Sequence, residues 1–350
     1  MAAEQDVSLL EAIRTALAEA MAANDRVVLL GQDVGRLGGV FRVTDGLWQR
    51  FPDRVFDTPL AEGAIVGASI GLAIGGLVPV AELQFLGFAH QAFHQIAQQL
   101  ARYRYRTRGR FHLPVTIRAP YGGGLRMPEF HPDSLEAQLA NTPGLKVFAP
   151  AFPDDAYAML QAAVHDPDPV VFLEPQRLYR SVRGPLRTTD NANRTDGTHG
   201  THGTAGTAST GAADSRLGAR IRRDGEDLLL VSWGPAVHTC LAAAHQLHTR
   251  HGVRAAVLDL RRLSPIDECG LLDAASSRRR VLVVHEGVRT AGLGAEVVAR
   301  LHEGLGGSGP LVVRRVTAPD TPYPPGRLED HYLPSQDSVA AAALTLLDGR

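Results

Sequence analysis

The sequence predicts an α/β protein built from two doubly wound α/β domains. Short runs of apolar and β-branched residues alternate with segments that carry apolar residues at helical spacing, and both halves of the 350-residue chain show this alternation. A stretch without large apolar residues divides the halves, and the chain is long enough to bury two cores of ordinary size. Strands and helices that alternate in this way form largely parallel sheets with helices on both faces.

The dividing stretch, residues 187–216, contains no Val, Ile, Leu, Met, Cys or aromatic residue. A segment of this composition cannot bury enough apolar surface to offset the entropy of ordering it. We therefore expect a first domain at residues 1–186, a disordered low-complexity linker at 187–217 and a second domain at 218–350.

The first domain is expected to open with an amphipathic helix. Ser8 and Glu11 form a capping-box pattern, and the apolar residues that follow keep to one helical face: Leu9, Ile13, Leu17 and Met21. Beyond this helix the expected strands are residues 26–31, 78–85, 113–119, 144–149 and 170–174, and the expected helices are residues 93–105 and 154–165.

The second domain repeats the alternation. Its expected strands are residues 227–232, 253–260, 280–286 and 311–316, and its expected helices are residues 236–249, 267–276 and 293–303. The segment AGLGA at residues 291–295 follows one of these strands, but it lacks the third glycine of a dinucleotide-binding fingerprint. The sequence therefore disfavours a nicotinamide-dependent dehydrogenase.

Charge and cysteine usage narrow the range of partners. Thirty-six basic and thirty-seven acidic side chains leave no net field to attract nucleic acid or an anionic membrane. Cys240 and Cys269 are too few for a disulfide framework or a cysteine-based metal site. The N-terminus shows no basic stretch followed by an apolar core, so we expect no secretory signal and a cytoplasmic protein.

One carboxylate stands out at the start of a long uncharged run. Glu62 is followed by 19 residues without charge, and glycines recur at every fourth position: Gly63, Gly67, Gly71 and Gly75. On a helix this spacing makes a smooth stripe, which predicts a tight helix–helix or subunit contact. A carboxylate that leads into a dry contact must be paired, protonated or used, so Glu62 is the candidate functional residue of this run.

Two other interpretations of the run stay open. The run is nearly long enough to span a bilayer, but it contains five glycines and has no basic flanks. Glu62 could also be a helix-start acid that is satisfied by nearby backbone N–H groups.

Two further motifs have an ordinary structural explanation. His131 follows a glycine-rich loop at residues 120–124, and a lone histidine of this kind is more often structural than catalytic. The RYRYR run at residues 102–106 alternates cations with aromatic rings, but without a wider basic surface it favours a helix end or a subunit contact over nucleic-acid stacking.

Taken together, the motifs of the chain resemble one family, the beta subunits of thiamine-diphosphate-dependent 2-oxo acid dehydrogenases. Within it the branched-chain enzymes look most similar. The matching stretches are GGVFRVT at Gly38, RVFDTPLAEGAIVG at Arg54, AELQF at Ala81, RYRYR at Arg102, TIRAPYGGG at Thr116, PGLKV at Pro143, FLEPQRLYR at Phe172, VSWG at Val231, HEGVRTAG at His285 and DTPYP at Asp320. They cover both domains, so the resemblance spans nearly the whole chain except the linker.

The resemblance implies a transketolase-like pyrimidine-binding domain and a transketolase C-terminal-like domain, in an alpha2beta2 heterotetramer with an alpha subunit. Glu62 would hydrogen-bond N1′ of the cofactor aminopyrimidine and promote its imino tautomer. Phe88 would stack on the pyrimidine, Leu60 would line its pocket, and Gln84 of the AELQF stretch would belong to the same site. His131 would deliver protons to intermediates and handle the lipoyl group of a lipoylated acyltransferase core.

The resemblance also implies a potassium site and shows three departures. The potassium ligands would be Thr116, Asp166 and the backbone carbonyls of Leu113, Val115, Ala163 and Asp168. Gln32 replaces a glutamate that is common in the family, Phe130 replaces a histidine, and Pro132-Asp133 replaces Ser-Gln or Ser-Glu after His131. The last departure bears on how His131 is placed and how a lipoyl domain docks.

Half of a thiamine diphosphate site is missing from the sequence. In the family that the chain resembles, a Gly-Asp-Gly run and a downstream asparagine pair supply the hard oxygen ligands for magnesium on the diphosphate, and neither occurs in the chain. An alpha subunit must therefore hold magnesium and the diphosphate. The leading hypothesis is oxidative decarboxylation of a branched-chain 2-oxo acid with acyl transfer to the acyltransferase. Alternatives are a pyruvate or acetoin dehydrogenase beta subunit, and a non-catalytic oligomer scaffold.

Overall fold

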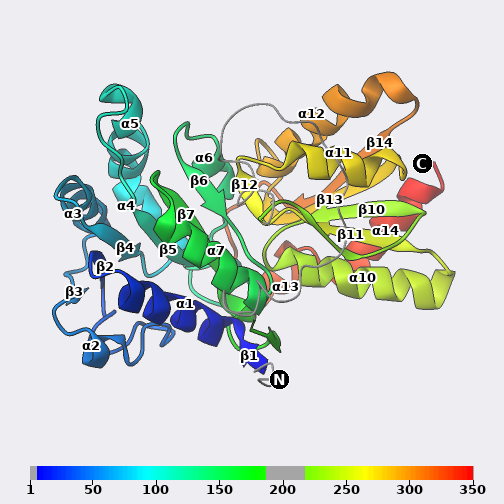
Figure 1. Ribbon diagram of the computed structural model, residues 1–350. Coiled ribbons are helices and arrows are strands. Elements are labelled where there is room, and N and C mark those ends of the chain that lie inside the picture. Colours follow the sequence, from blue (N-terminus) through cyan, green and yellow to red (C-terminus); the bar gives the residue numbers. More distant parts are fainter. Residues whose placement is uncertain (1–5, 187–216, 350) are drawn as a thin grey trace, which may run out of the picture.

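The structure is a computed structural model that describes residues 6–186 and 217–349. Within these ranges the chain forms two α/β domains that lie side by side, the first in blue to green and the second in yellow to red in Figure 1. This confirms the predicted fold class. Nearly all of the linker predicted at 187–217 lies outside the described residues.

The first domain is built on a seven-stranded sheet with the order β12-β6-β7-β5-β4-β2-β3. Neighbouring strands are parallel except for β12 with β6. The strands are β2 (Val27–Gly31), β3 (Val55–Asp57), β4 (Val78–Glu82), β5 (Thr116–Tyr121), β6 (Lys146–Phe148), β7 (Val170–Pro175) and β12 (Arg262–Ser264). A short antiparallel pair ties the start of this domain to its end: β1 (Asp6–Ser8) with β8 (Arg183–Pro185).

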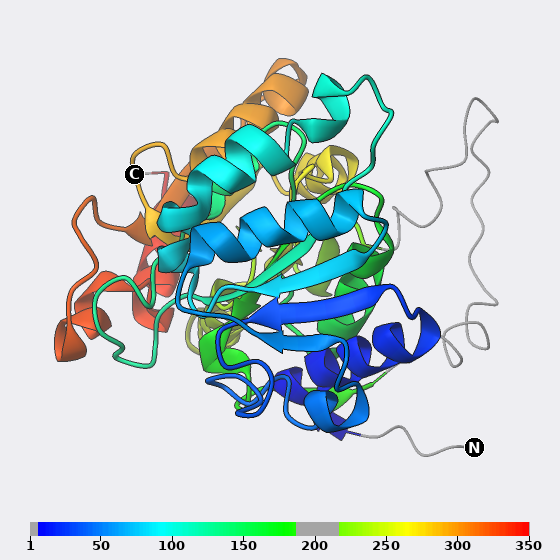
Figure 2. The ribbon, with the colours of Figure 1, turned by 90° about the vertical axis from the view of Figure 1, so that its left-hand side faces the viewer.

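Helices cover both faces of this sheet (Figure 2). α1 (Leu9–Ala23) packs against α7 (Pro153–His165) on one face, and α3 (Glu62–Ile74) packs against α4 (Ala89–Phe93) on the other. The capping box predicted at the start of α1 is present, because Ser8 Oγ accepts from Glu11 N and Glu11 Oε2 accepts from Ser8 N. The shorter helices are α2 (Leu47–Arg50), α5 (Tyr103–Arg106) and α6 (Glu136–Ala140).

The helix predicted at residues 93–105 is interrupted. A π-helical turn, His94–Leu100, follows α4, and two further residues separate it from α5. Helical spacing in the sequence predicts the segment, but it does not indicate the wider π-helical turn, which is rare and occurs mostly inside α-helices.

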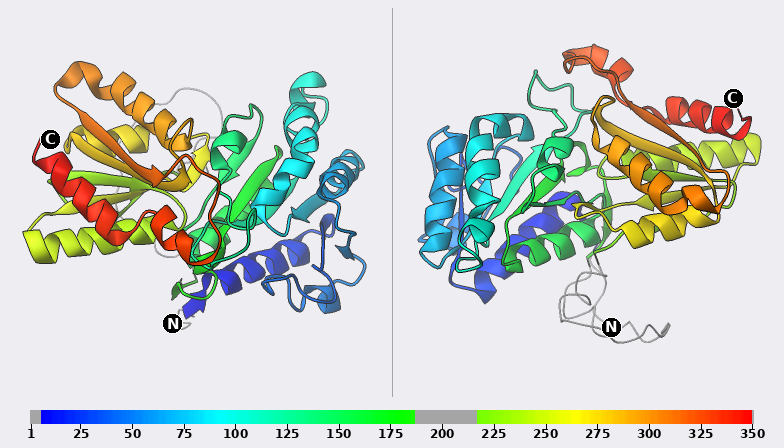
Figure 3. Two further views of the ribbon diagram at one scale, coloured as in Figure 1. Left: turned by 180° about the vertical axis from the view of Figure 1, so that it is seen from behind. Right: turned by 90° about the horizontal axis from the view of Figure 1, so that it is seen from above.

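The second domain has a five-stranded sheet with the order β14-β13-β10-β11-β9, in which only the β9–β11 pair is antiparallel. Its strands are β9 (Arg220–Arg223), β10 (Leu228–Ser232), β11 (Ala255–Asp259), β13 (Arg280–Val288) and β14 (Val312–Ala318). Helices again cover both faces, as Figure 3 shows, with α10 (Ala236–His251) and α14 (Gln336–Leu347) on one and α11 (Glu268–Ser276) and α12 (Leu293–Leu305) on the other. α13 (Glu329–Tyr332) precedes α14 and lies against the first domain.

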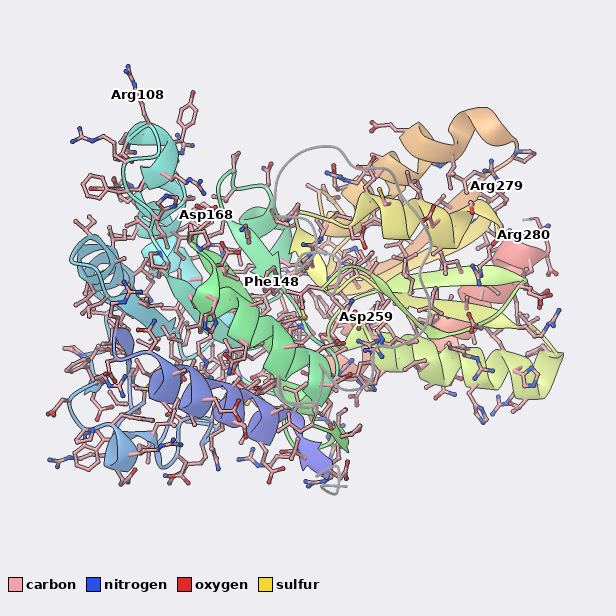
Figure 4. The ribbon with its side chains drawn as sticks, viewed as in Figure 1. Arg108, Phe148, Asp168, Asp259, Arg279 and Arg280 are labelled. Atoms are coloured by element: carbon pink, nitrogen blue, oxygen red, sulfur yellow. The ribbon has the colours of Figure 1, made fainter. Side chains whose placement is uncertain are left out.

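The two domains share a core and an ion network. Strand β12 comes from the second half of the chain but forms the edge of the first sheet, and one hydrophobic cluster runs across the boundary. Arg222 contacts the carboxylates of Asp155 in the first domain and Asp259 in the second, and Arg261 Nη1 donates to Asp155 Oδ1 at 2.9 Å (Figure 4 labels Asp259). The domains are therefore joined by buried contacts as well as by the linker.

A buried ion network spans three strands of the first sheet. Arg118 on β5 donates two hydrogen bonds to Glu174 on β7, at 2.7 and 2.8 Å, and contacts Glu82 on β4. All three side chains are almost fully buried. Burial raises the pKa of Glu82, and the charge of Arg118 opposes the rise. Tyr179 also donates to Glu174.

Arg118→Met should destabilise the chain strongly, because it leaves two buried carboxylates without a cation. We expect the free energy of unfolding to fall by about 3–5 kcal/mol. Chemical denaturation measures this, with Arg300→Met as a control, since Arg300 pairs with Glu268 and Glu296 on the surface and should cost less than about 1 kcal/mol. Equal losses in the two variants would contradict a central role for the network.

Candidate functional site

The predicted site residues collect at the carboxyl edge of the first sheet. Leu60 and Glu62 follow β3, Gln84 and Phe88 follow β4, and His131 lies on the loop after β5. Because β3, β2, β4 and β5 are parallel neighbours, the segments after them emerge at one edge of the sheet. Open α/β sheets place their ligands at this edge.

Glu62 is buried and incompletely satisfied. It is the first residue of α3, its side chain is 3% exposed, and its Oε2 atom has no hydrogen-bond partner in the described chain. The alternative in which nearby N–H groups satisfy this acid therefore fails for Oε2. A buried carboxylate oxygen without a donor costs free energy, so this atom is placed to receive a hydrogen bond from something outside the described chain.

Two other side chains of the first domain also leave buried polar atoms without hydrogen-bond partners. Thr58 Oγ1 and Gln95 Oε1 are buried without hydrogen-bond partners. Gln95 lies against the start of α3, because a Cβ at Gly63 would come within 3.6 Å of its amide and 3.3 Å of the Gln91 carbonyl oxygen. Gln95 thus offers a further hydrogen-bond acceptor to a polar ligand beside the start of α3.

An aromatic cluster holds His131. Its ring centroid lies 4.4 Å from that of Phe85 and 5.1 Å from that of Phe88. His131 Nδ1 is 3.0 Å from the carbonyl oxygen of Glu129, which can only accept, so Nδ1 carries the proton. This leaves Nε2 of the neutral ring free to exchange a proton with a ligand. The structure therefore brings the predicted Phe88 and His131 together.

Gln176, which the sequence analysis did not single out, connects two parts of the loop that carries His131. Gln176 Nε2 donates to the carbonyl oxygen of Gly122 at 2.5 Å and to that of His131 at 3.4 Å. Gln176 is buried just beyond the end of β7. It therefore fixes the distance between the two ends of the loop.

Carboxylates of the second domain hold the same loop from the other side. Gly123 N donates to Glu286 Oε2 at 3.0 Å, and Gly124 N donates to Glu329 Oε1 at 2.9 Å. Arg126 N donates to the second oxygen of Glu329 at 3.0 Å. These partners lie more than 160 residues away in the sequence, so no local pattern could indicate them.

Gln84 and Leu60 complete the predicted cofactor residues and differ in their surroundings. Gln84 Nε2 donates to Asp33 Oδ2 at 3.1 Å, so its position is fixed within this chain. The side chain of Leu60 is 65% exposed. The role predicted for Leu60, lining a cofactor pocket, therefore requires a second surface that covers this side chain.

Among the predicted potassium ligands, one polar side-chain atom has no partner, but both carboxylates are already paired with basic side chains. Thr116 Oγ1 is buried without a hydrogen-bond partner, but Lys146 Nζ lies 2.8 and 2.6 Å from the two carboxylate oxygens of Asp166. Asp168 pairs with Arg104 at 2.7 Å, and Figure 4 marks Asp168. The residues whose carbonyls would contribute are buried: Leu113, Val115 and Ala163. The potassium site stays a prediction, and a cation at Asp166 would have to compete with the Lys146 ammonium.

The glycine stripe of α3 divides into an inner and an outer part. Gly63 packs against Gln91 and Gln95, whereas a Cβ at Gly67 would meet only Gln95 Cγ at 4.0 Å and one at Gly71 would meet nothing within 4 Å. Gly67 and Gly71 are exposed, and α3 lies on the side of the first domain turned away from the second (Figure 2). Nothing inside the described chain requires glycine at these two positions.

Gly71→Val should therefore prevent subunit assembly without unfolding the chain. A valine at this position meets no atom of its own chain but would block a helix of another subunit that approaches through the stripe. Size-exclusion chromatography with light scattering would compare the variant with Ala341→Val, an exposed change on α14. A Gly71→Val chain that assembles like Ala341→Val would show that the stripe is not a contact.

Glu136 lies at the domain boundary in an unusual environment. Trp233 Nε1 donates to its Oε1 at 3.3 Å, and its Oε2 is buried without a partner. Burial raises the pKa of Glu136 to about 7, and the charge of Glu286 adds to the rise. The nearby His285 stacks on Trp233, and burial lowers the pKa of His285 to about 4.

The raised pKa of Glu136 predicts a pH dependence of stability. The folded chain binds this proton more tightly than the unfolded chain, so the free energy of unfolding should fall as the pH rises from about 4.5 to about 7, by about 3 kcal/mol. Glu136→Gln should remove this fall. Chemical denaturation of both chains at pH 5 and pH 8 measures the difference, and parallel pH profiles would contradict it.

Comparisons with known proteins identify both domains and the family. The sequence profile of the transketolase pyrimidine-binding domain matches residues 5–182, and that of the transketolase C-terminal domain matches residues 218–339. The chain is 42% identical over 337 residues to the 3-methyl-2-oxobutanoate dehydrogenase subunit beta of Mycobacterium tuberculosis, which covers 96% of this chain and 90% of that protein. It is 40% identical over 343 residues to the pyruvate dehydrogenase E1 component subunit beta of Bacillus subtilis, covering 98% and 99%.

A solved structure shows the same fold. A split-gene transketolase, described as an inactive beta4 tetramer, aligns with a TM-score of 0.72 at 24% sequence identity and covers 98% of both chains. Among the described residues of the present chain, no helix has the length and hydropathy needed to cross a bilayer. The same residues include no group of three or more His, Cys, Asp or Glu placed to bind a metal ion.

Proposed function

The chain belongs to the family of beta subunits of 2-oxo acid dehydrogenases, and we propose that it provides the aminopyrimidine half of a thiamine diphosphate site for decarboxylating a branched-chain 2-oxo acid. The observation that carries this proposal is the buried Oε2 atom of Glu62, which lacks a donor. The family is thiamine-diphosphate-dependent, and N1′ of an aminopyrimidine that shares a proton with Glu62 would supply that donor.

The residues present fit this end of the cofactor. Glu62 offers a carboxylate in a buried position, Phe88 offers an aromatic ring beside His131, and Leu60 offers an apolar side chain that is open to a neighbouring surface. When bound, thiamine diphosphate supplies a carbon acid that adds to the 2-oxo carbonyl and accepts the electrons of the departing carboxylate. Glu62 would hold and return the proton of the aminopyrimidine in a site from which water is excluded.

His131 would serve the substrate side of the same site. Its Nδ1 proton is engaged by the Glu129 carbonyl, so Nε2 is the atom that would give or take a proton. The ring is oriented by Phe85 and Phe88, and its loop is held by Gln176 and by carboxylates of the second domain. These contacts support a proton-transfer role, because they fix both the tautomer and the direction of the ring.

The remaining half of the site must come from an alpha subunit. The chain has no Gly-Asp-Gly run and no Asn-Asn pair with which to hold magnesium on the diphosphate. The exposed Leu60 and the outward glycines of α3 are surfaces that such a subunit would cover. We infer an alpha2beta2 heterotetramer that delivers the acyl group to a lipoylated acyltransferase.

The choice of 2-oxo acid is tested by assay. The relatives named for 3-methyl-2-oxobutanoate and for pyruvate are almost equally similar to this chain, at 42% and 40% identity, so the AELQF and RYRYR stretches carry the branched-chain assignment. The chain reconstituted with its alpha subunit should show a higher kcat/KM on 3-methyl-2-oxobutanoate than on pyruvate. A preference for pyruvate would move the substrate assignment and leave the cofactor assignment intact.

A further inference from the structure

A cavity between the two domains has an acidic lining that the proposed reaction does not use. It measures about 370 Å³ and lies beyond the His131 loop, against the start of α12 and the segment before α13. Four carboxylates and two tyrosines line it: Glu129, Asp133, Glu136, Glu286, Tyr323 and Tyr332. No Lys, Arg or His residue is among the described residues of its wall, so the charged side chains of this wall are all acidic.

The carboxylates of this cavity differ in how many hydrogen-bond and ion-pair partners they have. Glu286 is paired, since Arg177 Nη2 lies 2.8 Å from its Oε1 and Gly123 N donates to its Oε2. Glu136 is 2% exposed, and its Oε2 has no hydrogen-bond partner in the described chain. Asp133 is half-buried and forms no ion pair with the described residues. Glu136 and Asp133 therefore have no ion-pair partner among the described residues. Burial raises the pKa of Asp133, and the charge of His90 opposes the rise.

Asp133 also marks a difference from the family pattern. It belongs to the Pro132-Asp133 pair that replaces Ser-Gln or Ser-Glu after His131. Asp133 lies in the cavity wall with Tyr332, and burial and then the charge of Asp133 raise the pKa of Tyr332 to about 12.

We propose that the cavity binds a guanidinium or primary alkylammonium group. Such a cation would donate hydrogen bonds to Glu136 Oε2 and to Asp133, and it would lie against the rings of Tyr323 and Tyr332, whose centroids are 4.6 Å apart. The volume is at the lower end of small-molecule sites, which suits a compact organic cation. A bare metal ion fits less well, because the described residues bring no three His, Cys, Asp or Glu side chains together for one.

The cation could belong to a free small molecule or to a side chain of an associated subunit. Both sources present the same group to Glu136 and Asp133, and they differ in whether the cavity is filled after assembly. The site is separate from Glu62 and from the predicted cofactor residues, so it does not depend on the proposed decarboxylation.

The fluorescence of Trp233 can report cation binding in the cavity directly, because Trp233 Nε1 donates a hydrogen bond to Glu136. In the full chain carrying Trp48→Phe, Trp233 is the remaining tryptophan of two. At pH 8, methylguanidinium chloride and methylammonium chloride should change its fluorescence to saturation, whereas sodium chloride at equal ionic strength should not. Glu136→Gln should raise the dissociation constant at least about tenfold, the loss expected for one charged hydrogen bond.

Asp133→Asn provides a second variant in a half-buried position, in case Glu136→Gln disturbs folding, and should raise the dissociation constant about threefold or more. Glu303→Gln, an exposed change on α12, should leave it unaltered. A response that does not saturate, that sodium chloride reproduces, or that neither cavity variant alters would overturn the proposal.

The same titration on the complex with the alpha subunit separates the two sources. If the ligand is a free molecule, methylguanidinium still gives a saturable change. If a subunit side chain fills the cavity, Trp233 emission shifts on assembly, added methylguanidinium has no effect, and Glu136→Gln removes the shift. Assembly that leaves the emission unchanged and also abolishes the titration would contradict both sources.

Discussion

Glu62→Gln should abolish most decarboxylation by the reconstituted enzyme while leaving its assembly intact. Glutamine has the same size and can occupy the same buried position at the start of α3, but its amide cannot take a proton from an aminopyrimidine nitrogen or return it. Loss of a positioned acid–base group lowers turnover by about 10²–10⁴-fold. Steady-state turnover on 3-methyl-2-oxobutanoate, measured at saturating cofactor, gives the size of the effect.

The same variant separates a catalytic role from a structural one. Size-exclusion chromatography should show Glu62→Gln in the full complex, since α3 keeps its outward glycines Gly67 and Gly71. Glu303→Gln, which is exposed on α12, should retain wild-type turnover. Turnover of Glu62→Gln within about threefold of wild type would remove Glu62 from the mechanism and favour a chain that serves as an oligomer scaffold.

The fold could be predicted from sequence where periodicity carries the information. Alternating strands and helices predict both sheets, and Ser8 with Glu11 predicts the start of α1 to the residue. The assignment of β12 to the first sheet could not be predicted in this way. Arg262–Ser264 is a short segment whose pairing with β6 depends on how the two domains meet, and sequence order places it with the second domain.

The residues of the candidate site also fall into two groups, those with a local sequence signal and those without one. Glu62 was predictable because a single acid before a long uncharged run is conspicuous, and the structure shows it buried with a free Oε2. Gln176, Glu286 and Glu329 were not, because they act on the His131 loop through contacts that join distant parts of the chain. The importance of such residues follows from geometry and leaves no local pattern.

The exposed part of the site also has a physical explanation. Leu60 is 65% exposed and the outward face of α3 meets nothing in its own chain, although both belong to apolar segments. The sequence offers a reason for this exposure. The chain lacks the magnesium-binding motif, so a second polypeptide is expected to supply it and to cover this surface. Under the proposed division of the site, Leu60 and the outward face of α3 are the surfaces that the second polypeptide would cover.

Calorimetric titration of thiamine diphosphate with magnesium tests this division of the site most directly. We predict no measurable binding to the isolated chain, because it lacks ligands for the metal and the diphosphate, and saturable binding that appears together with 2-oxo acid decarboxylation when the alpha subunit is added. Micromolar, magnesium-dependent binding to the isolated chain would contradict the division of the cofactor site between two polypeptides.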